Sequence, residues 1–207
     1  MKYIFMAGAP GSKWSSVAKN IYFSPDIDRS DANPAREYWH NASGTNQLMH
    51  IGAYFDPGME FDLSEQMNLE SKESLEEFFD SAFDPNGTGI RIIKSHIFSH
   101  HIDFIKQTWP EAPIILVHRS DDACLGWWVK CGHFDITYPK YDKYYIDLRN
   151  MAGIIAQQNA DILTAWSDND CFFIGDNVTL ADTLGIARPP EEYYQSYAEV
   201  DIEVTIM

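Results

Sequence analysis

The stretch IFMAGAPGSKWSSVAKNIY, residues 4–22, decides the fold, because it passes from an apolar run through a glycine-rich turn into an amphipathic segment. The apolar run has the character of a strand that is buried on both faces of a parallel sheet. Gly8 and Gly11 allow close backbone approach to a ligand, and the unpaired N–H groups at the start of the next helix attract anions. The stretch therefore predicts a phosphate-binding loop. Lys13 stands one place earlier than in the usual loop, and Trp14 follows it.

Short apolar runs alternate with longer amphipathic segments along the rest of the chain, which is typical of a parallel sheet covered by helices. We expect strands at 3–7, 90–96, 112–119 and 171–175. We expect helices at 14–23, 71–83, 99–109, 120–131, 145–166 and 180–186. The prediction is one domain over residues 1–207, a three-layer α/β fold with a mainly parallel sheet and an irregular insertion around 24–70. Residues 200–207 form either an edge strand or a tail that docks on a neighbour.

The start of the second helix is marked by a capping residue. Ser71 is the expected N-cap, and Ser74 with Glu77 forms an alternative capping box. In the helix at 120–131, two acidic residues occupy the first turn, where the helix dipole favours negative charge. These signals define where both helices begin.

The composition excludes several classes of partner. The chain has 15 Lys and Arg against 31 Asp and Glu, a formal net charge of −16, which argues against binding to nucleic acid or to an anionic membrane. An anionic ligand must therefore be held by a local basic cluster. Three cysteines, Cys124, Cys131 and Cys171, are an odd number in a chain that is long enough to fold without disulfides. With no segment long enough to cross a bilayer, the sequence predicts a soluble, cytoplasmic protein.

Polar residues follow the expected strands at their carboxyl ends, where ligands bind in an open parallel sheet. Lys94 and His96 close the second strand, and their spacing of two places them on one face. Arg119 follows the third strand and Asp176 the fourth. We therefore expect Lys13, Lys94, His96 and Arg119 around one crevice.

Metal chemistry is not indicated by these residues. A nucleoside triphosphatase needs a magnesium ligand, usually an Asp at the end of an apolar strand. The third strand ends in His118 and Arg119 instead, and only Asp176 stands in such a place. No histidine and cysteine group has paired ligand spacing. The residues favour a metal-free transfer, with cations and N–H groups neutralising the charge.

Residues 91–128, RIIKSHIFSHHIDFIKQTWPEAPIILVHRSDDACLGWW, resemble the sulfotransferases that use 3′-phosphoadenosine 5′-phosphosulfate. In that family a strand ends Lys-Thr-His, a short helix follows, and the next strand ends in an arginine that begins a helix. APGSKWSSV (9–17) is similar to the family's 5′-phosphosulfate loop, and FFIGDNVTLADTLGI (172–186) to the close of its core. The resemblance implies a P-loop NTPase-like fold. It also implies transfer of a sulfuryl group to a hydroxyl or amine of a small acceptor.

The resemblance assigns roles to individual residues. His96 takes the place of the catalytic base, and Lys13, with Lys94 as a second candidate, would stabilise charge on the transferred group. Arg119 would hold the 3′-phosphate of the cofactor. Cofactor binding is implied for Pro10, Gly11, Ser12, Lys13, Trp14, Ser15, Ser16, Arg119 and Trp127.

Several positions depart from the family's pattern. Gly11 stands where the family loop has its lysine and Lys13 where it has a glycine, so the loop lysine has moved. Gly126 takes the place of a serine that also contacts the 3′-phosphate. The late cofactor motif of the cytosolic enzymes is absent, and HFDITYPKYDKYY (133–145) occupies the corresponding loop.

Other interpretations stay open beside this one. His96 could be a hydrogen-bonded structural residue, and Arg119 could pair with Asp121 or Asp122. The glycine-rich turn could join strand and helix without holding a ligand. Two other functions are a P-loop kinase or nucleotidase, suggested by the GAPGS loop, and a non-catalytic nucleotide-binding module.

The acceptor is expected to be a small apolar or ring-bearing molecule, because the two segments that would line its pocket are rich in aromatic residues. The segments are 33–70 and 132–145, with Tyr38, Trp39, His40, His50, Tyr54, Phe55, Phe134 and Tyr138. The negative charge of the chain disfavours an anionic polysaccharide.

Overall fold

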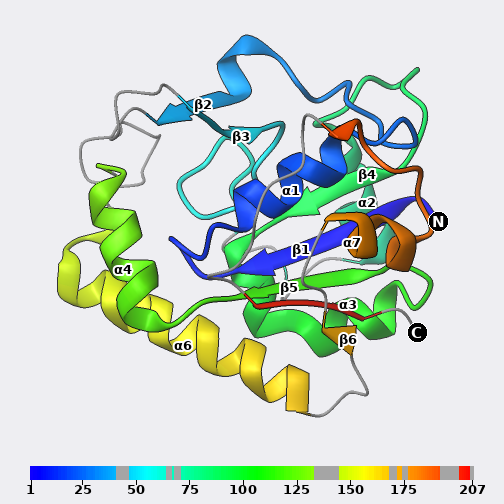
Figure 1. Cartoon of the computed structure of the whole chain (residues 1–207). Helices are drawn as coiled ribbons and strands as arrows, with labels where there is room; N and C mark the ends of the chain where they lie inside the picture. Colours follow the sequence, from blue (N-terminus) through cyan, green and yellow to red (C-terminus); the bar gives the residue numbers. More distant parts are fainter. Residues whose placement is uncertain are drawn as a thin grey trace.

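The computed structural model describes residues 1–40, 47–63, 67, 71–132, 145–167, 172–173, 177–191 and 201–205. Within these residues the chain forms an α/β fold with three parallel strands flanked by helices (Figure 1). The parallel strands are β1 (Tyr3–Gly8), β4 (Arg91–Lys94) and β5 (Ile114–His118). They confirm the strands that the sequence predicted in its first three apolar runs. The sheet order is β4-β1-β5-β7-β6.

Strand β1 lies at the centre of the parallel part, and all six of its residues are buried. Tyr3 and Phe5 pack into one apolar cluster, whereas Ile4 and Met6 pack into the cluster on the other face. A strand that is apolar on both faces is stable only between two layers. At Gly8, an added Cβ would lie 2.8 Å from the Ser12 hydroxyl oxygen, so a glycine is needed where the loop folds back over the strand end.

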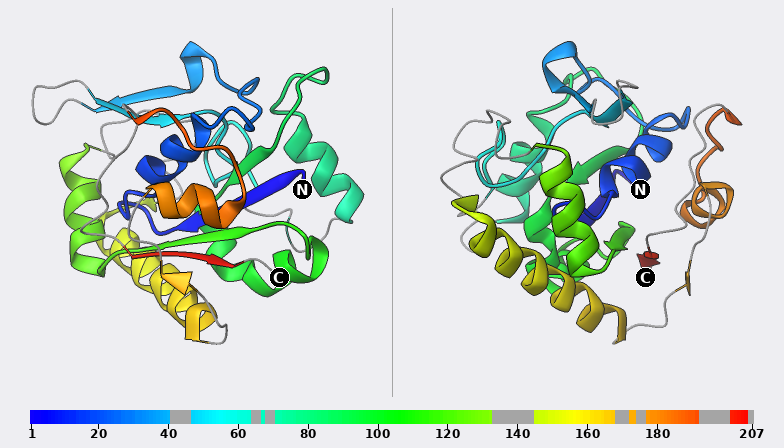
Figure 2. Two further views of the ribbon diagram at one scale, coloured as in Figure 1. Left: turned by 45° about the vertical axis from the view of Figure 1, so that its right-hand side comes forward. Right: turned by 60° about the vertical axis from the view of Figure 1, so that its left-hand side comes forward.

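Helices cover both faces of the sheet. On the face toward the viewer in Figure 1 lie α1 (Trp14–Tyr22) and α7 (Asn177–Leu184). On the other face lie α2 (Lys72–Asp80), the 3-10 helix η2 (His96–His101), α3 (Ile102–Thr108) and α6 (Leu148–Ser167). The right-hand view of Figure 2 shows α7 in orange and α6 in yellow on opposite sides. In the part of the chain described here, no helix combines the length and the apolar character needed to span a membrane.

The N-cap of α2 is the one that the sequence predicted. The Ser71 hydroxyl oxygen accepts a hydrogen bond from the backbone N–H of Ser74, at 3.3 Å. Leu75 and Phe79, one helical turn apart, bury the inner face of α2 against the core. The helix therefore begins at its cap and is stabilised by one apolar stripe.

Helix α4 (Asp121–Lys130) follows β5 and packs against α6 rather than against the sheet. Cys124 and Trp128 of α4 form a third apolar cluster, which also includes Ala9 from the loop after β1. Gly11 of the same loop has a φ of 82°, and an added Cβ there would collide with the carbonyl oxygen of Cys124. The loop therefore lies directly against the backbone of α4.

The segment 24–70, expected to be an irregular insertion, contains regular elements. They are a 3-10 helix, η1 (Pro34–Arg36), and the antiparallel strands β2 (Glu37–His40) and β3 (Gln47–Ile51). Strand β3 lies against α1, where the Lys19 ammonium donates to the carbonyl oxygen of Leu48 at 3.0 Å. The expectation missed the strand pair because neither short strand has a clear apolar alternation.

The strand that was one of the two expectations for residues 200–207 is present as β7 (Asp201–Thr205), but its expected position at the edge of the sheet was wrong. It pairs antiparallel with β5 on one side and with β6 (Phe172–Phe173) on the other. It is an interior strand of the sheet because β6 follows it at the edge. The strand expected at 171–175 is described only at the two residues of β6.

Candidate functional site

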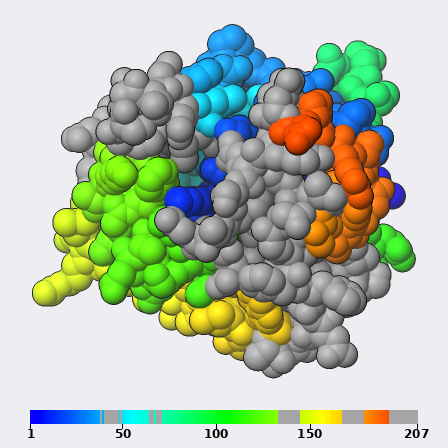
Figure 3. Space-filling view, viewed as in Figure 1, coloured from blue at the N-terminus to red at the C-terminus, as the bar shows by residue number. Residues whose placement is uncertain are grey.

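The loops after the three parallel strands meet at one end of the sheet. Strand β1 pairs in parallel with β4 on one side and with β5 on the other, so their carboxyl ends are neighbours. The ring nitrogen Nδ1 of His96 hydrogen-bonds to the carbonyl oxygen of Gly8, and Nη1 of Arg119 donates to that of Gly11 at 3.2 Å. The structure therefore brings His96 and Arg119 to the same loop. In Figure 3, dark-blue atoms of the N-terminal segment reach the surface beside the green atoms of α4.

Lys13 ends this loop in an unusual backbone conformation. Its φ of 66° lies in the left-handed region, which costs a residue other than glycine about 1–2 kcal/mol. Its ammonium lies 5.2 Å from the centre of the Trp127 ring on α4. The Lys130 ammonium lies 5.3 Å from the same ring. Two positive charges thus gather over Trp127, next to the start of α1.

The loop also presents hydroxyl groups. Ser12 is fully buried, and its hydroxyl oxygen has no hydrogen-bond partner among the residues that the structure describes. A buried hydroxyl in that state costs about 1–3 kcal/mol, which a bound ligand would recover. Ser15 lies in the first turn of α1, where the backbone N–H of Ser16 donates to the carbonyl oxygen of Lys13 at 2.9 Å and the N–H groups of the residues before it precede the first i→i−4 bond of the helix. These donors suit an anion.

His96 is buried and held in one orientation. Because the Gly8 carbonyl oxygen can only accept, Nδ1 of His96 carries the hydrogen, and the lone pair of the neutral ring is on Nε2. The ring packs against Trp14, with 4.2 Å between the ring centres. Nε2 lies 3.8 Å from Oδ2 of Asp56. The arrangement leaves Nε2 as the nitrogen that can take a proton.

Asp56 is a site residue that the sequence reasoning missed. Its Oδ1 accepts hydrogen bonds from the Ser95 hydroxyl, at 2.8 Å, and from the backbone N–H of His96. Burial raises the pKa of Asp56 above its ordinary value, against the opposing effects of His96 and of these hydrogen bonds. Asp56 therefore fixes the turn that carries His96. In the sequence it stands before Pro57 and Gly58 and resembles an ordinary turn residue.

Lys94, expected at the same crevice, lies against β3. Its ammonium donates to the carbonyl oxygen of Ile51 at 2.6 Å, and it lies 5.3 Å from the centre of the Tyr22 ring. Only 1% of the residue is exposed. Burial lowers the pKa of Lys94 to about 8, although the Asp31 carboxylate acts in the opposite direction. Lys13, which belongs to the loop itself, is the better candidate for the cation of the site.

The buried Lys94 predicts a specific pH dependence of stability. Its pKa falls from 10.5 in the unfolded chain to about 8 on folding. Between these two pH values, the lysine therefore binds more protons in the unfolded chain than in the folded one. Stability contributed by this group must therefore rise with pH. We expect the free energy of unfolding of the wild type to rise by about 2 kcal/mol relative to Lys94→Met between pH 7 and 9.5. Urea denaturation at both pH values measures this difference. If the free energy of unfolding changed equally with pH in the two proteins, folding would not lower the pKa of Lys94.

Residues 50–56, here called the 50–56 segment, run along the site from β3 to Asp56. Oδ2 of Asp31 accepts from the backbone N–H of Ala53 at 2.8 Å, and Oδ1 accepts from the hydroxyl of Tyr22. The backbone N–H of Phe55 donates to the carbonyl oxygen of Lys94 at 3.0 Å. The segment is thus fastened to β4 and, through Asp31, to α1. No pattern in the sequence indicates this role for Asp31.

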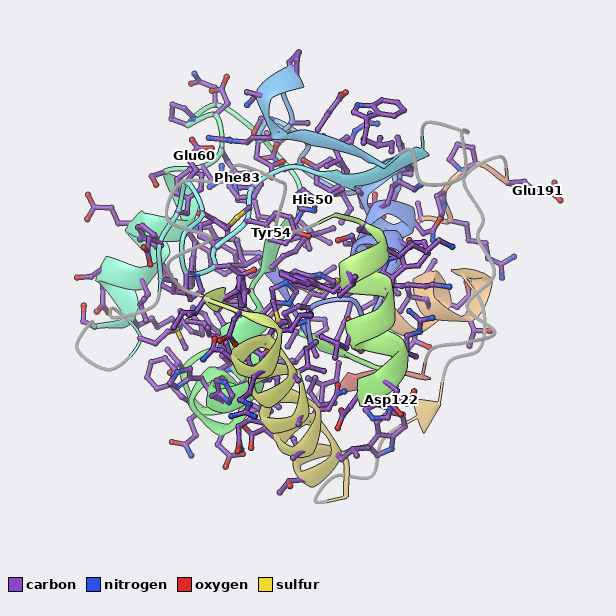
Figure 4. The ribbon with its side chains drawn as sticks, turned by 90° about the vertical axis from the view of Figure 1, so that its left-hand side faces the viewer. His50, Tyr54, Glu60, Phe83, Asp122 and Glu191 are labelled. Carbon is purple, nitrogen blue, oxygen red and sulfur yellow. The ribbon has the colours of Figure 1, made fainter. Side chains whose placement is uncertain are left out.

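Two rings of the 50–56 segment lie together, as Figure 4 shows for His50 and Tyr54. Their ring centres are 3.5 Å apart, and the two ring planes are inclined by 27°, so the rings are stacked. Nε2 of His50 hydrogen-bonds to the carbonyl oxygen of Gly52 at 2.7 Å, and burial lowers the pKa of His50 well below its ordinary value. His50 is therefore a neutral, buried support for Tyr54.

The aromatic residues expected to line an acceptor pocket do not all lie together. Tyr54 lies at the site, 6.3 Å from His96 between ring centres. Phe55 is fully buried in the apolar cluster beneath α2, η2 and α3, so its assignment to the pocket was wrong. Trp39 is 54% exposed on β2. The side chains of Tyr38 and His40, and all of Phe134 and Tyr138, lie outside the described part of the chain.

The start of α4 is fixed by Asn159, which the sequence reasoning also missed. Its side-chain amide donates to the carbonyl oxygen of Arg119 at 2.8 Å and to Oδ1 of Asp121 at 2.7 Å. Asp121 and Asp122 lie in the first turn of α4, as predicted, and Figure 4 labels Asp122 at that end of the helix. Asp176, the other expected polar strand end, lies outside the described residues. Asn159 therefore holds the backbone from which the Arg119 side chain reaches the loop.

Comparisons with models of known families, with curated proteins and with solved structures found no match. Within the described ranges, no group of three or more His, Cys, Asp or Glu side chains is arranged to hold a metal ion. The residues around the loop after β1 are therefore the basis on which a function is assigned.

Proposed function

We propose that this chain is a sulfotransferase with a P-loop NTPase-like fold. It would transfer a sulfuryl group from 3′-phosphoadenosine 5′-phosphosulfate to a hydroxyl or amine of a small acceptor. One observation carries the proposal: His96 hydrogen-bonds to Gly8, the last residue of β1, and Arg119 hydrogen-bonds to Gly11 in the loop that follows. A base that follows β4 and a cation that follows β5 thus contact the same glycine-rich turn.

The residues at the loop fit the cofactor. The buried Ser12 hydroxyl, Ser15 and the start of α1 would hold the 5′-phosphosulfate. Arg119 would bind the 3′-phosphate, since a guanidinium suits phosphate oxygens. The backbone N–H of Gly11, together with Trp14 and Trp127, would complete the cradle. Pro10 has no N–H and would only shape the loop, and the Ser16 N–H already donates to the Lys13 carbonyl oxygen at 2.9 Å. Lys13 and Arg119 supply the local positive charge that a chain of net charge −16 requires.

His96, Asp56 and Lys13 would have separate roles in the reaction. The cofactor, when bound, supplies an activated sulfuryl group. Nε2 of His96 takes the proton of the acceptor, while Nδ1–H stays on the Gly8 carbonyl oxygen. Oδ2 of Asp56, 3.8 Å from Nε2, stabilises the imidazolium that results. Lys13 and the N–H groups at the start of α1 stabilise the negative charge on the phosphosulfate side.

The acceptor would be a small molecule with an apolar or aromatic part. Tyr54 and Trp14, whose rings are 5.2 Å apart, provide an aromatic surface beside His96. Neither nucleic acid nor a membrane surface suits the strongly negative chain. A cytoplasmic location is part of the proposal, and the free thiols of Cys124 and Cys131 support it.

Thermal unfolding in the presence of nucleotides tests the proposal. Adenosine 3′,5′-bisphosphate without magnesium is expected to stabilise the protein by about 2.7 kcal/mol at a hundredfold excess over its Kd. ATP with magnesium as the only stabilising nucleotide would replace the proposal with a P-loop kinase. A protein that neither nucleotide stabilises would refute nucleotide binding at the loop.

A further inference from the structure

Tyr54 contacts residues of α1, of β4 and of its own segment. Its hydroxyl shares a hydrogen bond of 2.7 Å with the hydroxyl of Ser15 in the first turn of α1. Its ring stacks on His50 and lies 5.2 Å from Trp14 between ring centres. The Lys94 ammonium lies 5.7 Å from the centre of the same ring. Tyr54 is therefore held from both sides, and its hydroxyl reaches the helix start that would face the anion.

The direction of the Tyr54–Ser15 hydrogen bond determines what Ser15 can offer to a ligand. A serine hydroxyl has one hydrogen to donate and two lone pairs that accept. If Tyr54 donates to Ser15 Oγ, the hydrogen of Ser15 is available to an anion. If Ser15 donates to Tyr54, that hydrogen is used. An anion at the start of α1 selects the first arrangement, and the chain of two hydroxyls strengthens the outer bond.

A second, independent observation indicates an anion at this helix start. The Ser12 hydroxyl, three residues before Ser15, is fully buried and has no hydrogen-bond partner among the described residues. Ser12 also lies against the last residue of β1, since a Cβ added at Gly8 would be 2.8 Å from the Ser12 hydroxyl oxygen. A ligand that accepts from Ser12 at the loop would be adjacent to the first turn of α1.

We propose that Tyr54 is a positioning residue, which acts through Ser15 by donating to its hydroxyl oxygen so that Ser15 donates to the 5′-phosphate of the nucleotide. The proposal rests on the proposed function, because it requires a nucleotide at the loop. It also assigns a role to the 50–56 segment: the segment that carries Tyr54 and Asp56 supports both the anion site and His96.

Calorimetric titration with two nucleotides tests this role. Adenosine 3′,5′-bisphosphate carries the 5′-phosphate, and adenosine 3′-monophosphate lacks it but is otherwise the same. Tyr54→Phe is expected to weaken the bisphosphate about fivefold, the effect of one lost hydrogen bond, and to leave the monophosphate within twofold of the wild type. Ser15→Ala and the double variant Ser15→Ala/Tyr54→Phe are expected to bind the bisphosphate equally, because the two hydroxyls act as one unit.

Tyr3→Phe is the matched control. It also removes one tyrosine hydroxyl, but that hydroxyl donates to Asp80 at 2.8 Å, at the amino end of β1 and away from the loop. It is expected to leave the affinity ratio of the two nucleotides unchanged. Tyr54→Phe overturns the proposal if it weakens both nucleotides equally, which indicates a structural role, or neither of them. Additive losses in the double variant would also overturn it. A wild type that does not bind the bisphosphate refutes the proposed function and this role with it, an outcome distinct from the others.

Discussion

Gly11→Ala is expected to destabilise the fold by about 3 kcal/mol or more. The φ of 82° at Gly11 alone costs an alanine about 1–2 kcal/mol. The added Cβ would also collide with the carbonyl oxygen of Cys124, a backbone atom that cannot rotate away. Either the loop or α4 must move, and the hydrogen bond from Arg119 to Gly11 would be lost. Urea denaturation of the variant and the wild type measures the difference.

Gly126→Ala is the matched control for this prediction. Gly126 lies within α4, and an added Cβ there would meet no atom within 4 Å. Alanine in a helix interior is favoured over glycine by about 1 kcal/mol, so this variant is expected to be slightly more stable than the wild type. Equal stabilities for Gly11→Ala and Gly126→Ala would contradict the close contact between the loop and α4.

His96→Ala is expected to reduce turnover about 10²–10⁴-fold, the usual contribution of a general base. Binding of adenosine 3′,5′-bisphosphate is expected to remain, because His96 takes its proton from the acceptor and is not assigned to the nucleotide. Turnover is measured as bisphosphate released from 3′-phosphoadenosine 5′-phosphosulfate, with an acceptor found by screening small phenols, alcohols and amines. Calorimetry measures the binding.

His100→Ala serves as the control for the base. His100 is partly exposed and pairs with Asp161 of α6, away from the loop after β1. This variant is expected to turn over at the wild-type rate. Unchanged turnover in His96→Ala would instead support the interpretation of His96 as a hydrogen-bonded structural residue.

The parallel core could be predicted from the sequence because its signals are local. The residues of β1, β4 and β5 are almost all buried, and in the sequence each strand corresponds to a short apolar run bounded by polar or glycine residues. Ser71 marks the start of α2 through contacts only three residues away. Such features depend on neighbouring residues, and these are visible in the sequence.

The other strands depend on partners far along the chain. Strand β7 pairs with β5, about 90 residues earlier, so its place inside the sheet cannot be read from its own alternating pattern. Polar and apolar residues alternate in VDIEVT as they would in a half-exposed edge strand. The β2–β3 pair was missed for a related reason, since its two strands have only four and five residues.

The buried carboxylates of the site were missed because their partners are distant. Asp31 and Asp56 stand among turn-forming residues, where an Asp is usually exposed. Only the fold places Asp31 at the backbone of Ala53 and Asp56 at the backbone of His96. In contrast, His96 and Arg119 could be predicted, because each follows a recognisable strand and parallel strands end on the same side.

A crystal structure with adenosine 3′,5′-bisphosphate tests the central claim most directly. The 5′-phosphate is predicted to lie at the loop after β1, within hydrogen-bond distance of the Ser12 and Ser15 hydroxyls, with the 3′-phosphate on Arg119. A nucleotide bound elsewhere would contradict this account. One such place is the pocket at the amino ends of the strands, lined in part by Lys2, Lys72 and Trp109.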